Sequence, residues 1–230
     1  MTANVTVIIP AGGRGDRLGN KTPKQLILLD DRSVMEHTIR RFLEIETVAE
    51  IIIACHQDIL EPVRKMCTQM NSNVPIHFAP GGRERQDSVW SAMLIANPSF
   101  PYIAIHDAVR PFFPKNILTD GLKMLQDSSG LIAASPLVHT IKRAENNIIL
   151  ETLPRQQLWE IHTPQLFHRK ILFRAHHAAQ RDQFYGTDDA ILAERIGEKI
   201  TIFPDTNENI KITYPADLVL AKYFLKRKKQ

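Results

Sequence analysis

Short apolar runs alternate with amphipathic segments over most of the 230-residue chain. The apolar runs have the length and β-branched content of buried strands, and they cover residues 5–9, 50–54, 75–78, 102–106, 131–135 and 200–203. Apolar positions at helical spacing predict helices over about 33–43, 59–70, 88–96 and 190–196, with another from Pro215. Ser33 with Glu36 has the pattern of a capping box at one helix start. The alternating order predicts a parallel sheet with right-handed crossovers.

The segment after residue 135 departs from this alternation. Two apolar stems, 136–143 and 148–152, flank the polar residues Glu145, Asn146 and Asn147, which is a hairpin signal. No helix separates the stems, so the hairpin either folds back on its own domain or clasps a partner. We therefore expect a single α/β domain over residues 1–230. Its Rossmann-like, mostly parallel twisted sheet is flanked by helices, and a β-hairpin arm protrudes at about 137–158.

A glycine-rich loop follows the first apolar run, with the sequence Pro-Ala-Gly-Gly-Arg-Gly-Asp-Arg at positions 10–17. Glycines at 12, 13 and 15 allow successive N–H groups to curl around an anion. A dinucleotide-binding loop would need a further glycine at position 18, which is Leu, and a P-loop would need Gly-Lys-Ser/Thr, which is absent. The loop is followed by two cations, Arg17 and Lys24. This combination suits a nucleoside triphosphate held mainly by charge.

Three further features are predicted to meet that loop. Gly81 and Gly82 form a turn that opens the helix containing Ser88, so free N–H groups face outward there. Asp107 ends a buried strand, where it either caps the next turn or points into a ligand crevice. In open α/β sheets, ligands bind at the carboxyl ends of the strands. Lys211, on a predicted strand over 209–213, alternates with its apolar neighbours and so points away from them, toward the cleft.

Composition narrows the function class only slightly. Hydrophobic residues make up 43% and charged residues 23% of the chain, as in ordinary globular proteins. The formal charge is +4, and the tail at 226–229 supplies four positive charges, so the body is close to neutral and nucleic-acid binding is not expected. Cys55 and Cys67 form no metal or redox pattern. No apolar run approaches ~20 residues, and no leader segment is visible, so we expect a cytoplasmic protein without membrane contact.

Two other groups have ordinary structural explanations. His176 and His177 are expected on the surface of a helix, where adjacent side chains diverge by about 100°, so a shared metal site is not expected. Thr187 and Asp188 precede the helix at 190–196, where capping alone explains them.

The motifs together resemble a known enzyme family. The opening Pro-Ala-Gly-Gly-x-Gly-x-Arg-Leu followed by Pro-Lys-Gln is similar to the cytidylyltransferase and sugar-nucleotide pyrophosphorylase superfamily. His-Asp-Ala-Val-Arg-Pro-Phe at 106–112, Thr-Pro-Gln at 163–165 and Asn-Ile-Lys-Ile-Thr at 209–213 resemble the 2-C-methyl-D-erythritol 4-phosphate cytidylyltransferases. The resemblance covers about residues 5–225. It implies transfer of CMP from CTP to a sugar-alcohol phosphate, with release of pyrophosphate, in isoprenoid precursor synthesis.

The resemblance also implies roles for individual residues. Catalysis would fall to Arg17, Lys24 and Lys211. Nucleotide binding would fall to Pro10, Ala11, Gly12, Gly13, Gly15, Gly82, Arg85 and Ser88. The methylerythritol phosphate would be held by Asp107, Arg110, Thr163 and Thr187, with Thr140 and Arg155 reaching over from the partner of a homodimer. Mg²⁺ would accompany CTP, and its protein ligands are left open. His106 is expected to be structural, because a phosphate monoester is already an anionic nucleophile.

Several alternatives stay open at this stage. Ribitol-5-phosphate cytidylyltransferases share the first loop and the segment at 106–112, whereas residues 140–143 and 162–165 favour the methylerythritol enzyme. A nicotinamide oxidoreductase is disfavoured by the missing glycine. A nucleotide sensor without catalysis would not require Arg17, Lys24 and Lys211 together. Two positions depart from the family pattern, since Arg83 and His139 stand where relatives commonly have acidic residues.

Overall fold

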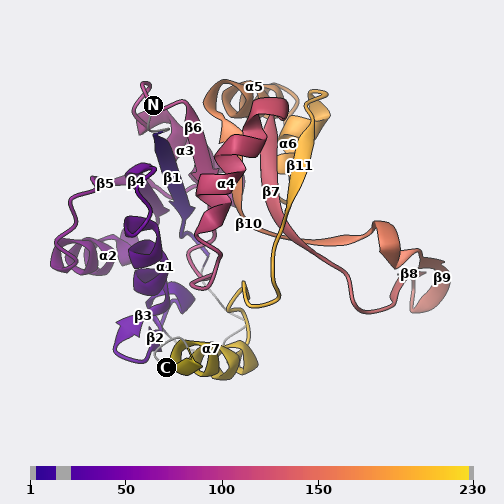
Figure 1. Cartoon of the computed structure of the whole chain (residues 1–230), viewed down its shortest axis with the longest axis horizontal. Helices are drawn as coiled ribbons and strands as arrows, with labels where there is room; N and C mark the ends of the chain where they lie inside the picture. Colours follow the sequence, from indigo (N-terminus) through magenta and orange to yellow (C-terminus); the bar gives the residue numbers. More distant parts are fainter. Residues whose placement is uncertain (1–3, 14–21, 228–230) are drawn as a thin grey trace.

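A seven-stranded sheet forms the centre of the molecule, as the computed structural model shows for residues 4–13 and 22–227 (Figure 1). The strand order is β11-β7-β10-β6-β1-β4-β5. The strands are β1 (Val5–Pro10), β4 (Val48–Cys55), β5 (Ile76–Pro80), β6 (Tyr102–Ile105), β7 (Gly130–Pro136), β10 (Trp159–His168) and β11 (Ile200–Pro204). Only β10 among these seven runs antiparallel to its neighbours, β6 and β7. The predicted mostly parallel sheet is confirmed.

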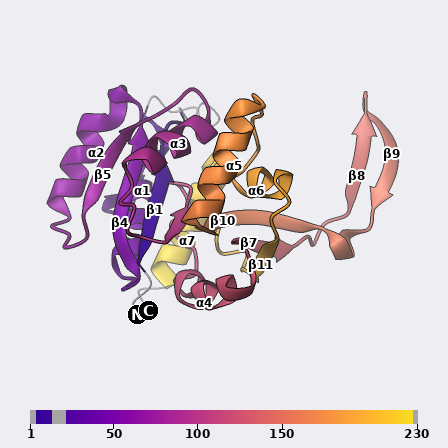
Figure 2. The same cartoon turned by 90° about the horizontal axis from the view of Figure 1, so that it is seen from above.

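Helices cover both faces of this sheet (Figure 2). One face carries α1 (Val34–Leu43), α2 (Gln57–Gln69) and α4 (Asn116–Met124), which η3 (Leu125–Asp127) extends. The other carries α3 (Arg85–Ile95), α5 (Arg169–Arg181) and α6 (Ala190–Arg195). Alternate side chains of β1 point to opposite faces, so Val7 and Ile9 pack in the first layer and Ile8 in the second. The continuous apolar runs therefore reflect strands that are buried on both sides.

The start of α1 shows how the predicted helix signals act. Ser33 is the N-cap, and its Oγ accepts the backbone N–H of Glu36 at 3.2 Å. The carboxylate of Glu36 pairs with Nε of Arg40 at 2.8 Å, one turn along the helix. The predicted cap at Ser33 is confirmed, while the charge of Glu36 supports the exposed face of the helix.

A small layer closes the carboxyl edge of the sheet. It consists of the hairpin β2 (Leu28–Leu29) with β3 (Arg32–Ser33) and of α7 (Pro215–Arg227), packed over a third apolar cluster. The strand predicted over 209–213 is wrong: that segment is irregular. The N–H of Ile212 bonds the carbonyl of Val109 at 3.0 Å, and Asn209 and Ile212 are buried. The segment crosses the ends of the strands and therefore has no parallel neighbour with which to form a ladder.

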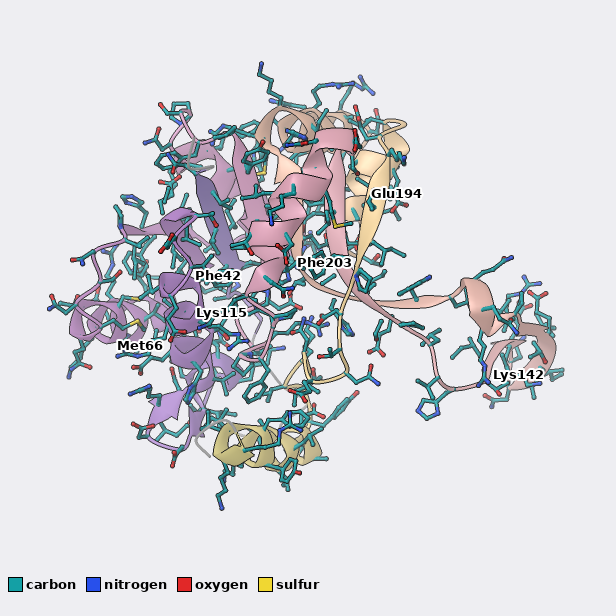
Figure 3. All side chains as sticks on the ribbon, in the orientation of Figure 1. Phe42, Met66, Lys115, Lys142, Glu194 and Phe203 are labelled. Carbon is teal, nitrogen blue, oxygen red and sulfur yellow. The ribbon has the colours of Figure 1, made fainter. Side chains whose placement is uncertain are left out.

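The hairpin arm is present and extends away from the body (Figures 1 and 2). It pairs β8 (Ile141–Glu145) with β9 (Ile148–Leu153), and η4 (Arg155–Gln157) leads back to β10. Asn146 and Asn147 have φ angles of 48° and 65°, as a two-residue turn of the hairpin type requires. Figure 3 shows Lys142 on the arm, far from Phe42 and Phe203 of the core. Apart from this arm, the predicted alternating layout is confirmed.

Within residues 4–13 and 22–227, no helix is both long enough and apolar enough to cross a lipid bilayer.

Candidate active site

A cleft lies at the carboxyl edge of the sheet, where the loops after β1, β4, β5 and β6 meet. The strands β4 and β6 lie on opposite sides of β1, so the chain leaves β1 in one direction and later returns on the other, which opens a crevice there. The lining residues are Pro10, Ala11, Gly12, Gly13, Lys24, Gln25, His56, Gly82, Arg83, Glu84, Arg85, Ser88, Asp107, Ala108, Val109 and Lys211.

The first glycine loop is tied to the short helix η2 (Lys24–Leu26). Nε2 of the buried Gln25 donates to the carbonyl of Ala11 at 2.8 Å. A Cβ on Gly13 would lie 3.8 Å from Cε of Lys24, so the lysine stem runs beside the loop. The predicted neighbours Gly15 and Arg17 lie outside the described residues. The structure thus brings Lys24 to the glycine loop, as the spacing predicts.

The second glycine loop is fixed by backbone bonds to the strand beside it. The N–H of Gly81 bonds the carbonyl of Cys55 at 2.8 Å. Oγ of Ser88 accepts the N–H of Gly82 at 2.9 Å, which folds the loop onto the start of α3. A Cβ on Gly82 would lie 2.2 Å from Cβ of Asp87, so this turn requires glycine. Both glycine loops therefore line the same cleft.

Asp107 forms the floor of the cleft and is surrounded by three cations. Its Oδ2 lies 3.0 Å from Nζ of Lys211 and 3.2 Å from Nε of Arg110, and its Oδ1 lies 3.6 Å from Nε of Arg85. Burial raises the pKa of Asp107, but Arg85, Lys211 and Arg110 together outweigh that effect and hold the pKa far below its ordinary value. A carboxylate with so low a pKa is a poor proton acceptor. It instead holds the cations in place.

Arg85 connects this floor to the helices behind it. Its Nη1 donates to Oδ2 of the fully buried Asp189 at 2.5 Å, and Oδ1 of Asp189 lies 3.2 Å from Nε2 of His176. Burial lowers the pKa of Arg85, but Asp189 and Asp107 raise it above its usual value. His176 is fully buried, so its predicted surface position is wrong: α5 turns this histidine inward to Asp189. Arg85 is thereby held between two carboxylates.

His106 and Thr163 fix the backbone at Asp107. Nε2 of His106 donates to the carbonyl of Arg110 at 3.0 Å, so Nδ1 carries no proton and accepts the hydroxyl of Thr163 at 3.0 Å. The Thr163 oxygen in turn accepts the N–H of Asp107 at 3.0 Å. Burial lowers the pKa of His106 from 6.5 to about 3, which keeps the ring neutral. The expected structural role of His106 agrees with this geometry.

A pH dependence of stability follows from the buried neutral ring. Between pH 3 and 6.5 the unfolded chain binds the proton that folded His106 refuses, so the free energy of unfolding falls as pH falls below 6.5. We expect His106→Gln, which keeps a donor for the Arg110 carbonyl, to reduce this slope by about 1 kcal/mol per pH unit between pH 5 and 6, where carboxylates contribute little. Urea unfolding at several pH values measures it. His177→Gln, at an exposed position of α5, should leave the slope unchanged, and an unchanged slope in His106→Gln would contradict the assignment.

The structure brings most of the predicted site residues together. The cleft is lined by Pro10, Ala11, Gly12, Gly13, Lys24, Gly82, Arg85, Ser88, Asp107 and Lys211. Arg110 and Thr163 are buried beside it and act on Asp107. Thr187 is exposed in the loop before α6, and Thr140 and Arg155 lie on the arm.

Sequence reasoning missed other residues of this region. Gln25 and His56 line the cleft, and Asp189 holds Arg85. Gln25 belongs to the Pro-Lys-Gln motif, so its position next to Lys24 in the sequence could have indicated that it lies at the cleft. His56 follows a predicted buried strand, which is the same signal that singled out Asp107. The sequence offers no signal for Asp189, because an acidic residue before a helix usually acts as its N-cap.

The cleft has the charge and position of an anion-binding active site. The positive side chains in its lining, Lys24, Arg83, Arg85 and Lys211, outnumber the negative ones, Glu84 and Asp107. The two glycine loops at the carboxyl edge of a mostly parallel sheet, with Lys24 and Lys211 lining the same cleft, suit the phosphate groups of a nucleotide. The family match makes the chain a nucleotidyltransferase. The chain belongs to the 2-C-methyl-D-erythritol 4-phosphate cytidylyltransferase family, whose sequence model matches residues 5–227.

Individual relatives cover the whole chain. A 2-C-methyl-D-erythritol 4-phosphate cytidylyltransferase of Syntrophus aciditrophicus is 38% identical over 229 residues, which are 99% of this chain and 98% of the relative. That of Carboxydothermus hydrogenoformans is 34% identical over 97% of this chain and 96% of its own length. The crystal structure of the Thermus thermophilus enzyme has a TM-score of 0.80 at 28% identity and covers 97% of this chain and 99% of its own. The resemblance seen in the motifs is confirmed.

Proposed function

We propose that this chain transfers CMP from CTP to the phosphate of 2-C-methyl-D-erythritol 4-phosphate and releases pyrophosphate. The observation that carries the proposal is the position of Lys24 and Lys211 on the cleft of a chain that belongs to this family. The reaction joins an anionic phosphate to the α-phosphorus of CTP. It therefore depends on alignment and on neutralising charge more than on covalent catalysis.

Lys24 and Lys211 are the proposed transition-state cations. Lys24 lies beside Gly13, where a phosphate chain would follow the loop. Lys211, from the segment before α7, lines the same cleft and pairs with Asp107. Positive charges fixed in this way stabilise the five-coordinate α-phosphorus without moving during the reaction. Arg17, which follows the last glycine of the loop at Gly15, is proposed to join them.

The remaining assignments divide between direct contact and support. We propose that the N–H groups of both glycine loops hold the nucleotide and that Asp107 accepts hydroxyl groups of the acceptor substrate. Arg110 is buried, and its Nη1 donates to the carbonyl of Asn209 at 2.7 Å, so we assign it the positioning of Asp107. Thr163 has the same supporting role. Thr187, exposed at the loop before α6, is proposed to meet the sugar alcohol phosphate.

Magnesium is proposed to enter with CTP. In the part of the chain that the structure describes, no group of three or more His, Cys, Asp and Glu side chains is placed to hold a metal ion. The carboxylate of Asp107, one of two acids that line the cleft, is paired with Arg85, Arg110 and Lys211. The fit is therefore to an ion held mainly by the triphosphate, where it would neutralise charge.

The arm is proposed to make a homodimer. On β9, the consecutive residues Ile148, Ile149 and Leu150 are 67%, 62% and 51% exposed. A two-stranded hairpin with no core beneath it is marginal in water, and such an apolar stretch usually marks an interface. A second copy would cover it, and Thr140 and Arg155 would then reach the partner's acceptor site. We place the enzyme in the cytoplasm, in keeping with its two free, buried cysteines.

The acceptor substrate separates this proposal from its closest alternative. With CTP and Mg²⁺, methylerythritol phosphate should release pyrophosphate with a kcat/KM at least about tenfold above that of ribitol 5-phosphate, because one unpaired polar group in an acceptor site costs roughly that factor. A coupled pyrophosphate assay measures both. If ribitol 5-phosphate were the better substrate, the nucleotidyltransferase class would stand and the assigned acceptor would be wrong.

A further inference from the structure

His56 is the cleft residue whose role remains unassigned. It follows β4, serves as the N-cap position of α2 without a side-chain capping bond, and is half-buried against the cleft. A Cβ on Gly12 would lie 3.2 Å from Nε2 and 3.4 Å from Cδ2 of His56. Because both atoms belong to one edge of the ring, the imidazole presents that edge, and not its face, to the glycine loop.

The two adjacent glycines divide the cleft into two ends. The Cβ position of Gly13 faces Lys24, whereas that of Gly12 faces His56 and lies 3.6 Å from Oγ of Ser88. The lysine end suits the phosphates of a nucleotide. The opposite end, with His56, Ser88 and the second glycine loop, is then where the base of an extended nucleotide lies.

A cytosine base needs an acceptor for its 4-amino group, and the described side chains at this end offer few. Arg83 carries donors only. Oγ of Ser88 already accepts from Gly82 and donates to the carbonyl of Glu84. Glu84 is exposed, and its carboxylate accepts a backbone N–H in the capping box of α3, so of these side chains it alone keeps spare acceptor positions.

Two other acceptors of the cleft are not available to the base. The carboxylate of Asp107 is paired with three cations and is assigned above to the acceptor substrate. Oε1 of Gln25 is enclosed by protein and closed off from solvent. An imidazole that carries its proton on Nδ1 offers Nε2 as a hydrogen-bond acceptor. His56 lines the cleft, and its Nε2 lies on the ring edge next to Gly12.

We propose that Nε2 of His56 accepts a hydrogen bond from the 4-amino group of the cytosine and so contributes to the choice of CTP over UTP. Uracil carries an oxygen at that position and has no proton to give. This inference rests on the proposed transfer from CTP. It makes His56 a specificity residue for the base, distinct from the lysines that act on the phosphates.

The test compares CTP with UTP in His56→Leu and His56→Gln. His56→Leu should raise KM for CTP and lower its kcat/KM about tenfold, the effect of one lost hydrogen bond, with little change for UTP. The ratio of the two kcat/KM values should therefore fall by about the same factor. In His56→Gln, Oε1 reaches roughly the position of Nε2, so most of the ratio should return. An unchanged ratio in His56→Leu, or an equal fall for both nucleotides, would overturn the proposal.

Two controls keep the result interpretable. His177→Leu, on the exposed side of α5, should leave both kcat/KM values unchanged. If His56→Leu does not fold, His56→Asn replaces it, because Asn is a good N-cap but too short to place an acceptor at Nε2. Calorimetric binding of CTP and UTP gives the same ratio without turnover. Wild-type protein that binds CTP but releases no pyrophosphate would refute the proposed reaction and leave the inference on His56 to the binding data.

Discussion

Lys24→Ala is expected to lower kcat by about 10²–10³, the effect of removing one preorganised charge from a transition state. Lys24 lies beside Gly13 and lines the cleft. In the proposed reaction it neutralises the charge that grows as the α-phosphorus becomes five-coordinate. KM for CTP should change less than kcat, because both glycine loops are proposed to hold the ground-state nucleotide as well. Steady-state pyrophosphate release at saturating acceptor measures both constants.

A matched lysine separates this effect from a general loss of positive charge. Lys65→Ala removes the same charge from an exposed position of α2 and should keep wild-type kcat. Unfolding midpoints of both variants should stay close to wild type. If Lys24→Ala kept its kcat, the lysine would have no part in the chemical step, and Lys211 would have to supply the charge from the other wall.

Mixing two inactive variants should restore about a quarter of wild-type activity, if the arm completes the partner's site. Lys24→Ala damages the body of a subunit and Arg155→Ala its arm. In a mixed dimer one site combines both defects and the other has neither. At equal mixing about half of the dimers are mixed, and each has one intact site. The measurement is pyrophosphate release after subunit exchange, compared with each variant alone.

The arm itself must survive the substitution. Nη1 of Arg155 donates to the carbonyl of Val138 at 2.5 Å and so links the two stems, which means that Arg155→Ala could loosen the arm. Thr140→Val, on the same arm, is a second variant expected to be inactive, and it keeps the hydrogen bond between Arg155 and Val138. Light scattering of each sample tests whether the protein is a dimer. An active monomer, or no recovery although labelled subunits exchange, would contradict a shared site.

The sequence predicted the core of the fold because burial leaves a simple pattern. The run at 5–9 reads as a strand covered on both faces, and β1 is that strand. The sequence of β10, which contains Thr163, does not show that this strand runs antiparallel. The direction of a strand depends on the neighbours with which it pairs. The segment 209–213 has strand composition, yet Asn209 and Ile212 are used to anchor it across the edge of the sheet. In this segment, tertiary contacts override the local preference for a strand.

The site was predictable where residues lie next to a turn or a strand end. Lys24 and Asp107 are of that kind. The surroundings of Asp107 were not, because Arg85 and Lys211 approach it from segments far away in the sequence, and only Arg110 is close in sequence. His176 was misplaced for the same reason: only the folded chain shows that it meets a buried Asp189. Contacts between distant segments carry no signature in one sequence.

The antiparallel strand β10 connects the root of the arm with the backbone at Asp107, although the two lie at different places in the fold. At one end it continues the arm, with Trp159 paired to Pro136 of β7. Farther along, Thr163 holds the backbone of Asp107 in its own subunit. In the proposed dimer, a substitution at the root of the arm would therefore disturb the home site and the partner's site together. If the arm completes the partner's site, such root variants would couple the two subunits, and the cooperativity of the rate with acceptor concentration would show this coupling.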